Sequence, residues 1–178
     1  MISNIFLISR SILFWINIVF SVLIFGPVTF LVDLISYNSC LYLSKKWCRY
    51  NLFFLKYVCL LSYNFDNDEI KTSKIIISRH QSTWETFFFT AYIDYPIFIL
   101  KKELLMIPLF GWCLYLLKHI SIDRSDGTSS LKKIMKSCDE HIKENRTIII
   151  FPEGTRSLYG TKAKLKRGVF KILESVKG

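Results

Sequence analysis

The sequence predicts an α/β fold, a layered sheet flanked by helices, with a membrane-associated helical segment at its amino terminus. Two observations support this. Short β-branched runs alternate with helix-length segments after residue 63, which is typical of a largely parallel sheet with crossover helices. The first 63 residues are instead apolar and aromatic. The 178 residues suffice for one domain with a core. We therefore expect membrane-associated helices over 1–63 and an α/β domain over 64–178.

The amino-terminal segment is expected to enter a bilayer. Ser11–Val32 contains no charged residue, and as a helix it would measure about 33 Å, enough to cross the hydrocarbon core. Gly26-Pro27 leaves open whether this segment spans or turns back as a re-entrant hairpin. Cys40–Tyr63 mixes aromatic and basic residues, as in a helix lying among lipid headgroups. Arg10 alone precedes the apolar run, so the remainder should face the cytoplasm.

Composition also indicates a membrane partner. The chain is 51% hydrophobic yet carries a net charge of +10, and such an excess implies an anionic partner. The two properties together favour a phospholipid bilayer over nucleic acid. The five cysteines are odd in number and lack a CxxC pair, so they are interpreted as reduced thiols and not as a disulfide framework or metal site.

The α/β region divides into alternating elements, and its polar clusters follow the strands. Predicted strands are Lys74–Ser78, Pro96–Leu100, His119–Ile122 and Thr147–Phe151, and predicted helices are Thr83–Tyr92, Leu104–Leu117, Thr128–Asn145 and Gly168–Val176. His80 follows the first strand, Asp123-Arg124 the third, and Glu153–Arg156 the fourth. Because ligands bind at the carboxyl ends of parallel strands, these clusters predict one shared site.

His80 and Glu85 allow two interpretations. Five residues apart, they meet only if His80 lies in a loop and Glu85 in the first helical turn. Ser82 and Glu85 have the spacing of a capping box, so Glu85 could simply cap a helix. Alternatively, Glu85 orients one ring nitrogen of His80 and leaves the other free as a general base. Arg124 and Arg156 offer planar forks to phosphate oxygens, or they form ordinary surface ion pairs.

Four motifs resemble those of the glycerolipid acyltransferase family. HQSTWE (His80–Glu85) resembles its His-x4-Asp signature, and FPEGTRS (Phe151–Ser157) matches its second signature residue for residue. IPLFGW (Ile107–Trp112) and SIDRSDG (Ser121–Gly127) occupy the intervening positions in order. The resemblance, which covers roughly Lys74 to Gly168, implies an acyltransferase-like fold.

The resemblance implies transfer of a fatty acyl group from a thioester, either acyl-CoA or acyl carrier protein, to the free hydroxyl of lysophosphatidic acid. His80 would deprotonate the hydroxyl while Glu85 orients it. Neither a metal nor any other cofactor is expected, and the enzyme would sit on the bacterial inner membrane, facing the cytoplasm. The implied phosphate site consists of Arg124, Glu153, Gly154, Thr155 and Arg156, and the implied acyl- or membrane-facing residues are Trp84, Phe87, Phe88, Phe110 and Trp112.

The sequence departs from the family pattern in three respects. Glu85 replaces the usual Asp, and Lys118 stands where many members have Gly. The chain also ends at Gly178, before the apolar, proline-containing strand that normally follows. We therefore expect a catalytic domain that is truncated at its carboxyl end. Two alternatives remain open: an acyltransferase for another lysophospholipid, and an inactive membrane-bound remnant of the family.

Overall fold

A computed structural model of the chain describes residues 2–65, 70, 72–123, 127–162 and 164–177. Its centre is a parallel four-stranded sheet with the order β1-β4-β2-β3. In chain order the elements are α1 (Ile2–Asp33), α2 (Tyr37–Tyr57), β1 (Ile75–Ile77), α4 (Trp84–Tyr92), β2 (Pro96–Lys101), η1 (Lys102–Met106), α5 (Phe110–Leu116), β3 (Ile120–Ile122), α6 (Gly127–Lys143), β4 (Thr147–Ile150) and α7 (Arg167–Lys177).

The sheet confirms the predicted fold class and all four predicted strands. Strand β4 lies between β1 and β2, with Ile148 paired to both Ile75 and Ile97. All four residues of β4 are buried, because a central parallel strand is covered on both faces, and this explains the uninterrupted apolar run. The order also requires crossover connections, which the intervening helices supply.

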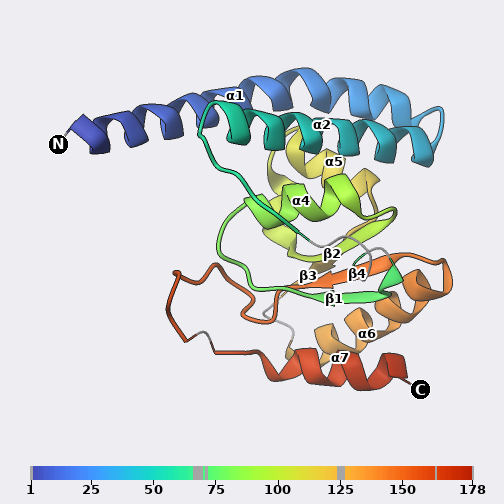
Figure 1. Cartoon of the computed structure of the whole chain (residues 1–178). Coiled ribbons are helices and arrows are strands. Elements are labelled where there is room, and N and C mark those ends of the chain that lie inside the picture. Colours follow the sequence, from blue (N-terminus) through green and yellow to red (C-terminus); the bar gives the residue numbers. More distant parts are fainter. Residues whose placement is uncertain (1, 66–69, 71, 124–126, 163, 178) are drawn as a thin grey trace.

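The helices form layers on both sides of the sheet (Figure 1). Helices α6 and α7 cover one face, where they share a core with the strands; its buried members are Ile97, Ile120, Ile134, Cys138, Ile148, Ile150 and Ile172. Helices α4 and α5 lie on the other face, and α1 and α2 lie outside them (Figure 1). The strand ends that were predicted to carry the polar clusters therefore emerge at one edge of a sheet that is covered by helices on both faces.

The predicted helix Leu104–Leu117 is two shorter helices, η1 and α5. Pro108 has no N–H to donate and disfavours helical geometry at the preceding residue, and Leu109 adopts a positive φ of 62°. Gly111 then packs against the backbone of η1: a Cβ there would lie 2.3 Å from the carbonyl oxygen of Leu105. The chain thus folds α5 back on η1 instead of continuing one helix.

Helices α1 and α2 form an antiparallel hairpin in which α1 continues through Pro27. Gly26-Pro27 therefore does not turn the chain back. A polar network joins the two helices: Asn17 donates its amide to Asn51 Oδ1 at 3.0 Å, and Trp47 Nε1 donates to Ser21 Oγ at 3.0 Å. Such bonds between side chains of two packed helices fix the register of the pair.

One face of α2 is buried against α4, so the two predicted segments share a core. Its buried residues are Cys48, Leu52, Leu55, Phe87 and Ala91. Arg49 adds two hydrogen bonds, from Nε and Nη2, to the carbonyl oxygen of Ala91 at the end of α4. The segment Cys40–Tyr63, predicted to lie among headgroups, thus packs in part against another helix of the same chain. Its side chains Tyr42, Tyr50, Phe53 and Tyr57 are nevertheless exposed.

Helix α1 is long and apolar enough to cross a membrane, and most of it is uncovered by protein. Its exposed large apolar side chains are Ile5, Phe6, Leu7, Ile8, Ile12, Leu13, Trp15, Ile16, Val19, Phe20, Leu23, Ile24, Val28, Phe30 and Leu31. An apolar surface of this extent is unfavourable in water. It indicates that the chain associates with membranes.

Candidate active site

The predicted polar clusters gather at the carboxyl ends of the strands. His80 lies in the loop after β1, and Glu153–Arg156 follow β4, the neighbouring strand. Lys102 follows β2 and forms an ion pair with Asp123, which follows β3. Arg124, the other predicted phosphate ligand, lies outside the described residues. The edge of the sheet therefore brings together residues that are far apart in the sequence, such as His80 and Glu153, which are 73 positions apart.

His80 and Glu85 face each other, as the catalytic interpretation requires. Glu85 is the second residue of α4, and its Oε2 lies 3.8 Å from His80 Nδ1. That distance is longer than a hydrogen bond but within the reach of an ion pair. Nδ1 is buried and has no hydrogen-bond partner among the described residues, and Nε2 makes no hydrogen bond to them either.

Glu85 also holds the loop that carries His80. Its carboxylate accepts the backbone N–H groups of Gln81 at 3.0 Å and of Ser82 at 3.1 Å, and the Ser82 hydroxyl at 3.1 Å. The expected capping box is therefore present in part, since the Ser82 oxygen accepts the N–H of Trp84 and not that of Glu85. Burial raises the pKa of Glu85, but His80 and these N–H groups outweigh it, so the net pKa is lowered. Glu85 is thus a carboxylate at neutral pH.

The motif Phe151–Ser157 wraps around His80. The Phe151 ring stacks on the imidazole with 4.3 Å between ring centroids, and Glu153 is buried beneath the loop with its carboxylate toward Arg79. Sequence reasoning missed Arg79 and Phe151. Their only sequence signals are their positions, one directly before the histidine and one at the end of a strand.

Thr155 and Arg156 of this motif point outward. Gly154 has a φ of 67°, a conformation that favours glycine, and turns the chain so that Thr155 and Arg156 are exposed. Arg156 Nη2 donates to the Thr83 hydroxyl at 2.9 Å. A guanidinium group is therefore held against the same loop as His80, with its surface open to solvent.

Two of the predicted acyl- or membrane-facing residues are not exposed to lipid. Phe87 is 5% exposed and contacts Trp47 from α2, and Phe88 is 3% exposed in a second aromatic cluster. Both side chains are covered because α2 and the segment near Tyr63 lie over this face of α4. Trp84 and Phe110 are half-buried, whereas Trp112 is 54% exposed.

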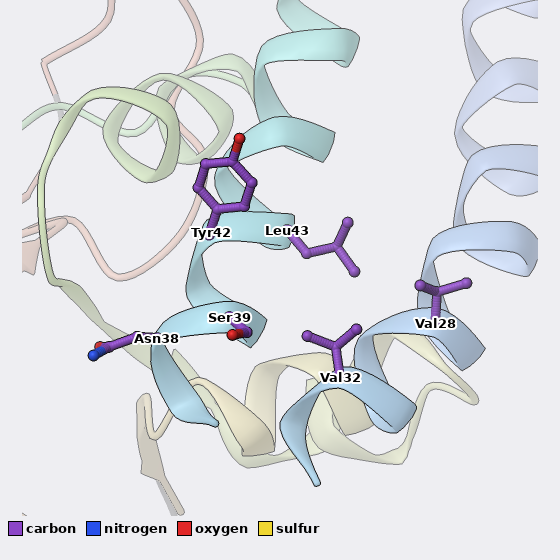
Figure 2. Close-up of a pocket in the computed structure, with 6 residues that line it drawn as sticks. All are labelled: Val28, Val32, Asn38, Ser39, Tyr42 and Leu43. Carbon is purple, nitrogen blue, oxygen red and sulfur yellow. The ribbon is translucent and has the colours of Figure 1, made fainter. Parts of the chain in front are cut away.

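An apolar groove of about 370 Å³ lies elsewhere, near the turn between α1 and α2. Figure 2 shows its lining residues, Val28, Val32, Asn38, Ser39, Tyr42 and Leu43. None of the predicted site residues is among them. Within the described ranges no group of three or more His, Cys, Asp or Glu could hold a metal ion.

The layered parallel sheet thus carries a histidine–carboxylate pair and the motif FPEGTRS at one edge. A family model described as Acyltransferase matches residues 62–178, and the chain belongs to this family. The 1-acyl-sn-glycerol-3-phosphate acyltransferase of Pseudomonas aeruginosa is 37% identical over 163 residues, which cover 89% of this chain and 63% of the relative.

The chain is also similar to a second curated relative and to a solved structure. The 1-acyl-sn-glycerol-3-phosphate acyltransferase of Helicobacter pylori is 40% identical over 91 residues, or 51% of this chain and 38% of the relative. The crystal structure of the 1-acyl-sn-glycerophosphate acyltransferase PlsC from Thermotoga maritima superposes with a TM-score of 0.77 at 19% identity, covering 97% of this chain and 71% of that one. The second likeness establishes the fold. The chain spans less than two thirds of the length of either curated relative.

Proposed function

We propose that the chain transfers a fatty acyl group from a thioester, acyl-CoA or acyl carrier protein, to the sn-2 hydroxyl of 1-acyl-sn-glycerol 3-phosphate, giving phosphatidic acid. The single observation that carries the proposal is the His80–Glu85 pair, in which Nδ1 faces a carboxylate and Nε2 makes no hydrogen bond to a described residue. The named activity of relatives in the same family supports the choice of acceptor.

The pair suits acyl transfer between a hydroxyl and a thioester. His80 Nε2 takes the proton of the hydroxyl as its oxygen attacks the thioester carbonyl carbon. The C–S bond then breaks, and His80 returns the proton to the departing sulfur. Glu85 carries negative charge beside the imidazolium that forms between these steps, and a preorganised charge of this kind stabilises the transition state.

Arg156 is the proposed phosphate ligand within the described residues, and Arg124 is proposed as a second. Guanidinium binds phosphate through two parallel hydrogen bonds. The link between Arg156 and Thr83 places this cation three residues from His80 along the loop. An acceptor with a phosphate would thus be anchored with its hydroxyl near Nε2. Gly154 and Thr155 shape the turn that presents Arg156.

Membrane attachment through α1 supplies the acceptor, which is itself a lipid. We place the exposed face of the hairpin in the bilayer and the sheet on the cytoplasmic side, because basic residues dominate after α1. Trp112 and the half-buried Trp84 and Phe110 are proposed to border the acyl chains.

The proposal is tested by incubating membranes that contain the chain with radiolabelled acyl-CoA, or acyl carrier protein, and lysophosphatidic acid. Labelled phosphatidic acid should form, and a His80→Ala variant of normal abundance should form at least about 100-fold less, which is the lower range for loss of a general base. Lysophosphatidylcholine and lysophosphatidylethanolamine serve as competing acceptors. Faster acylation of either competing lipid would show that lysophosphatidic acid is not the preferred acceptor. Full activity of His80→Ala would refute the mechanism.

A further inference from the structure

Glu153 is the most deeply buried carboxylate at the sheet edge, and both of its oxygens are engaged by the protein. Its side chain is 3% exposed. Oε2 accepts the backbone N–H of His80 at 3.2 Å, and Oε1 lies 3.7 Å from Nε of Arg79. A buried charge is stable only when it is paired and hydrogen-bonded. Arg79 and the amide of His80 meet that requirement.

The backbone of His80 is held on both sides by this one motif. While Glu153 accepts the N–H, the carbonyl oxygen of His80 accepts the backbone N–H of Ser157 at 2.8 Å and its hydroxyl at 3.4 Å. His80 lies in neither a helix nor a strand, so no ladder of backbone hydrogen bonds fixes it. The motif supplies that constraint instead.

Arg79 ties the same clamp to the loop beyond the motif. Its Nη2 donates to the carbonyl oxygen of Thr161 at 2.8 Å, while its Nε faces Glu153. The guanidinium is about half exposed, so it remains solvated if its carboxylate partner is removed. The reverse change, loss of Arg79, leaves a buried carboxylate with fewer partners and is the more costly one.

We propose that Glu153 is a positioning residue for His80 and not a ligand of the acceptor phosphate. A second anion next to a buried carboxylate is electrostatically unfavourable, and neither oxygen is open to substrate. Within FPEGTRS the work is thus divided: Phe151, Glu153 and Ser157 fix the histidine, and Arg156 faces the open side. This assignment rests on the proposed function for its kinetic consequence, but the clamp itself is a property of the fold.

The kinetic test compares Glu153→Ala and Glu153→Gln in the full chain. Gln retains an oxygen for the His80 N–H and Ala does not, so a small displacement of the base should lower kcat about 100-fold in Ala and less in Gln. The KM for lysophosphatidic acid should change by less than about threefold in both. Glu140→Ala, which removes an exposed carboxylate paired with Lys136, is the matched control and should alter neither constant.

A raised acceptor KM at unchanged kcat would overturn the proposal and make Glu153 a substrate ligand. A second measurement needs no activity. The chain has three histidines, so histidine-selective ¹⁵N labelling gives three backbone amide signals, and His80→Gln assigns one. Hydrogen exchange of the His80 amide should accelerate at least tenfold in Glu153→Ala and less in Glu153→Gln. Unchanged exchange would refute the clamp even if the acyl acceptor proves to be another lipid. Accelerated exchange in Glu153→Ala, together with no acyl transfer by the wild-type chain, would refute the proposed function and leave the clamp intact.

Discussion

At the scale of single residues, Glu85 combines two tasks that sequence reasoning treated as alternatives. The carboxylate accepts hydrogen bonds from Gln81 and Ser82, which shape the loop, and it also faces the His80 ring at 3.8 Å. Because the carboxylate has two oxygens with several lone pairs, one group can serve both. Capping the helix and orienting His80 are therefore compatible roles for Glu85. They differ in one requirement: stabilising the imidazolium needs the negative charge of Glu85, and capping does not.

Glu85→Gln isolates that charge. Gln keeps an oxygen for the N–H groups of the loop, so folding should be nearly normal. It carries no negative charge to stabilise the imidazolium, so kcat should fall about 100-fold or more. Purified variants are compared by acyl-transfer rate and thermal unfolding midpoint, with Glu85→Asp as the control that keeps the charge. Wild-type turnover in a folded Gln variant would assign Glu85 to capping alone.

Arg156 is a second residue that can be tested alone, because its proposed contribution is to binding of the acceptor and not of the donor. Arg156→Ala should raise the KM for lysophosphatidic acid at least tenfold, because a charge-assisted pair is lost, and should change the KM of the donor less. Arg156→Lys should restore part of the affinity, since it keeps the charge but not the planar fork. The measurement is initial rate against the concentration of each substrate. Equal losses with a phosphate-free acceptor would indicate a structural role instead.

At the scale of elements, the confirmed predictions are those for segments whose local residue pattern is enough to define the structure. The four strands are recognisable because each is a short β-branched run between polar residues, and the packing of the sheet uses that pattern directly. The prediction of one continuous helix over Leu104–Leu117 was wrong, because Pro108 interrupts it and Gly111 lets α5 fold back on η1. That close approach depends on backbone atoms of a neighbouring element, which no local propensity encodes.

The limits at the site have a similar cause. His80, Glu85 and Arg156 were identifiable because each belongs to a short motif. The pairing of Arg79 with Glu153 was not, since it depends on β1 and β4 being neighbours in the sheet. Burial of Phe87 under α2 was likewise invisible, because an aromatic run looks the same whether lipid or another helix covers it.

Gly111→Ala tests the junction between η1 and α5. The new Cβ would lie 2.3 Å from Leu105 O and 2.8 Å from Leu104 O, so the backbone must shift, and we expect a loss of at least about 2 kcal/mol in the free energy of unfolding. Gly168→Ala is the matched control. Its Cβ meets only Leu131 Cδ1 at 3.4 Å, and helix propensity favours Ala. The thermal unfolding midpoint, measured in detergent, should fall clearly for Gly111→Ala and not for Gly168→Ala.

At the scale of the whole molecule, stability should depend on pH through His119. Burial, with help from His141 and Arg146, lowers the pKa of His119 to about 3, and its Nδ1 accepts the N–H of Phe98 at 3.3 Å, which requires the neutral ring. The unfolded chain binds this proton near pH 6.5. Stability should therefore be full above that pH and fall by up to about 1.4 kcal/mol per unit below it.

His119→Asn removes the titration while keeping an acceptor for Phe98. Thermal midpoints measured at pH 7.5 and pH 5 should differ less in this variant than in the wild type. His141 also has a lowered pKa, because of burial and Arg146, so some dependence should persist. An unchanged difference between the two pH values would mean that His119 contributes nothing to it.

The last prediction concerns how the whole molecule is attached to the membrane. Deleting residues 1–63 is a poor test, since it would expose Phe87 and Ala91, which α2 covers. Substitutions on exposed side chains of α1 avoid this problem. Ile16 and Phe20 lie four residues apart on one side of the helix and are 47% and 61% exposed. If they contact hydrocarbon, changing both to Lys costs several kcal/mol of membrane affinity.

Wild-type chain should remain in membranes washed with about 1 M salt, because at that ionic strength the Debye length is roughly 3 Å, whereas apolar burial is not screened. The Ile16→Lys/Phe20→Lys variant should move into the soluble fraction under the same wash. Phe170→Lys is the control: this side chain is 53% exposed on α7, on the face of the sheet opposite the hairpin (Figure 1). It should stay membrane-bound. Release of the control to the same extent, or retention of the double variant, would show that the exposed face of α1 does not anchor the chain in the membrane.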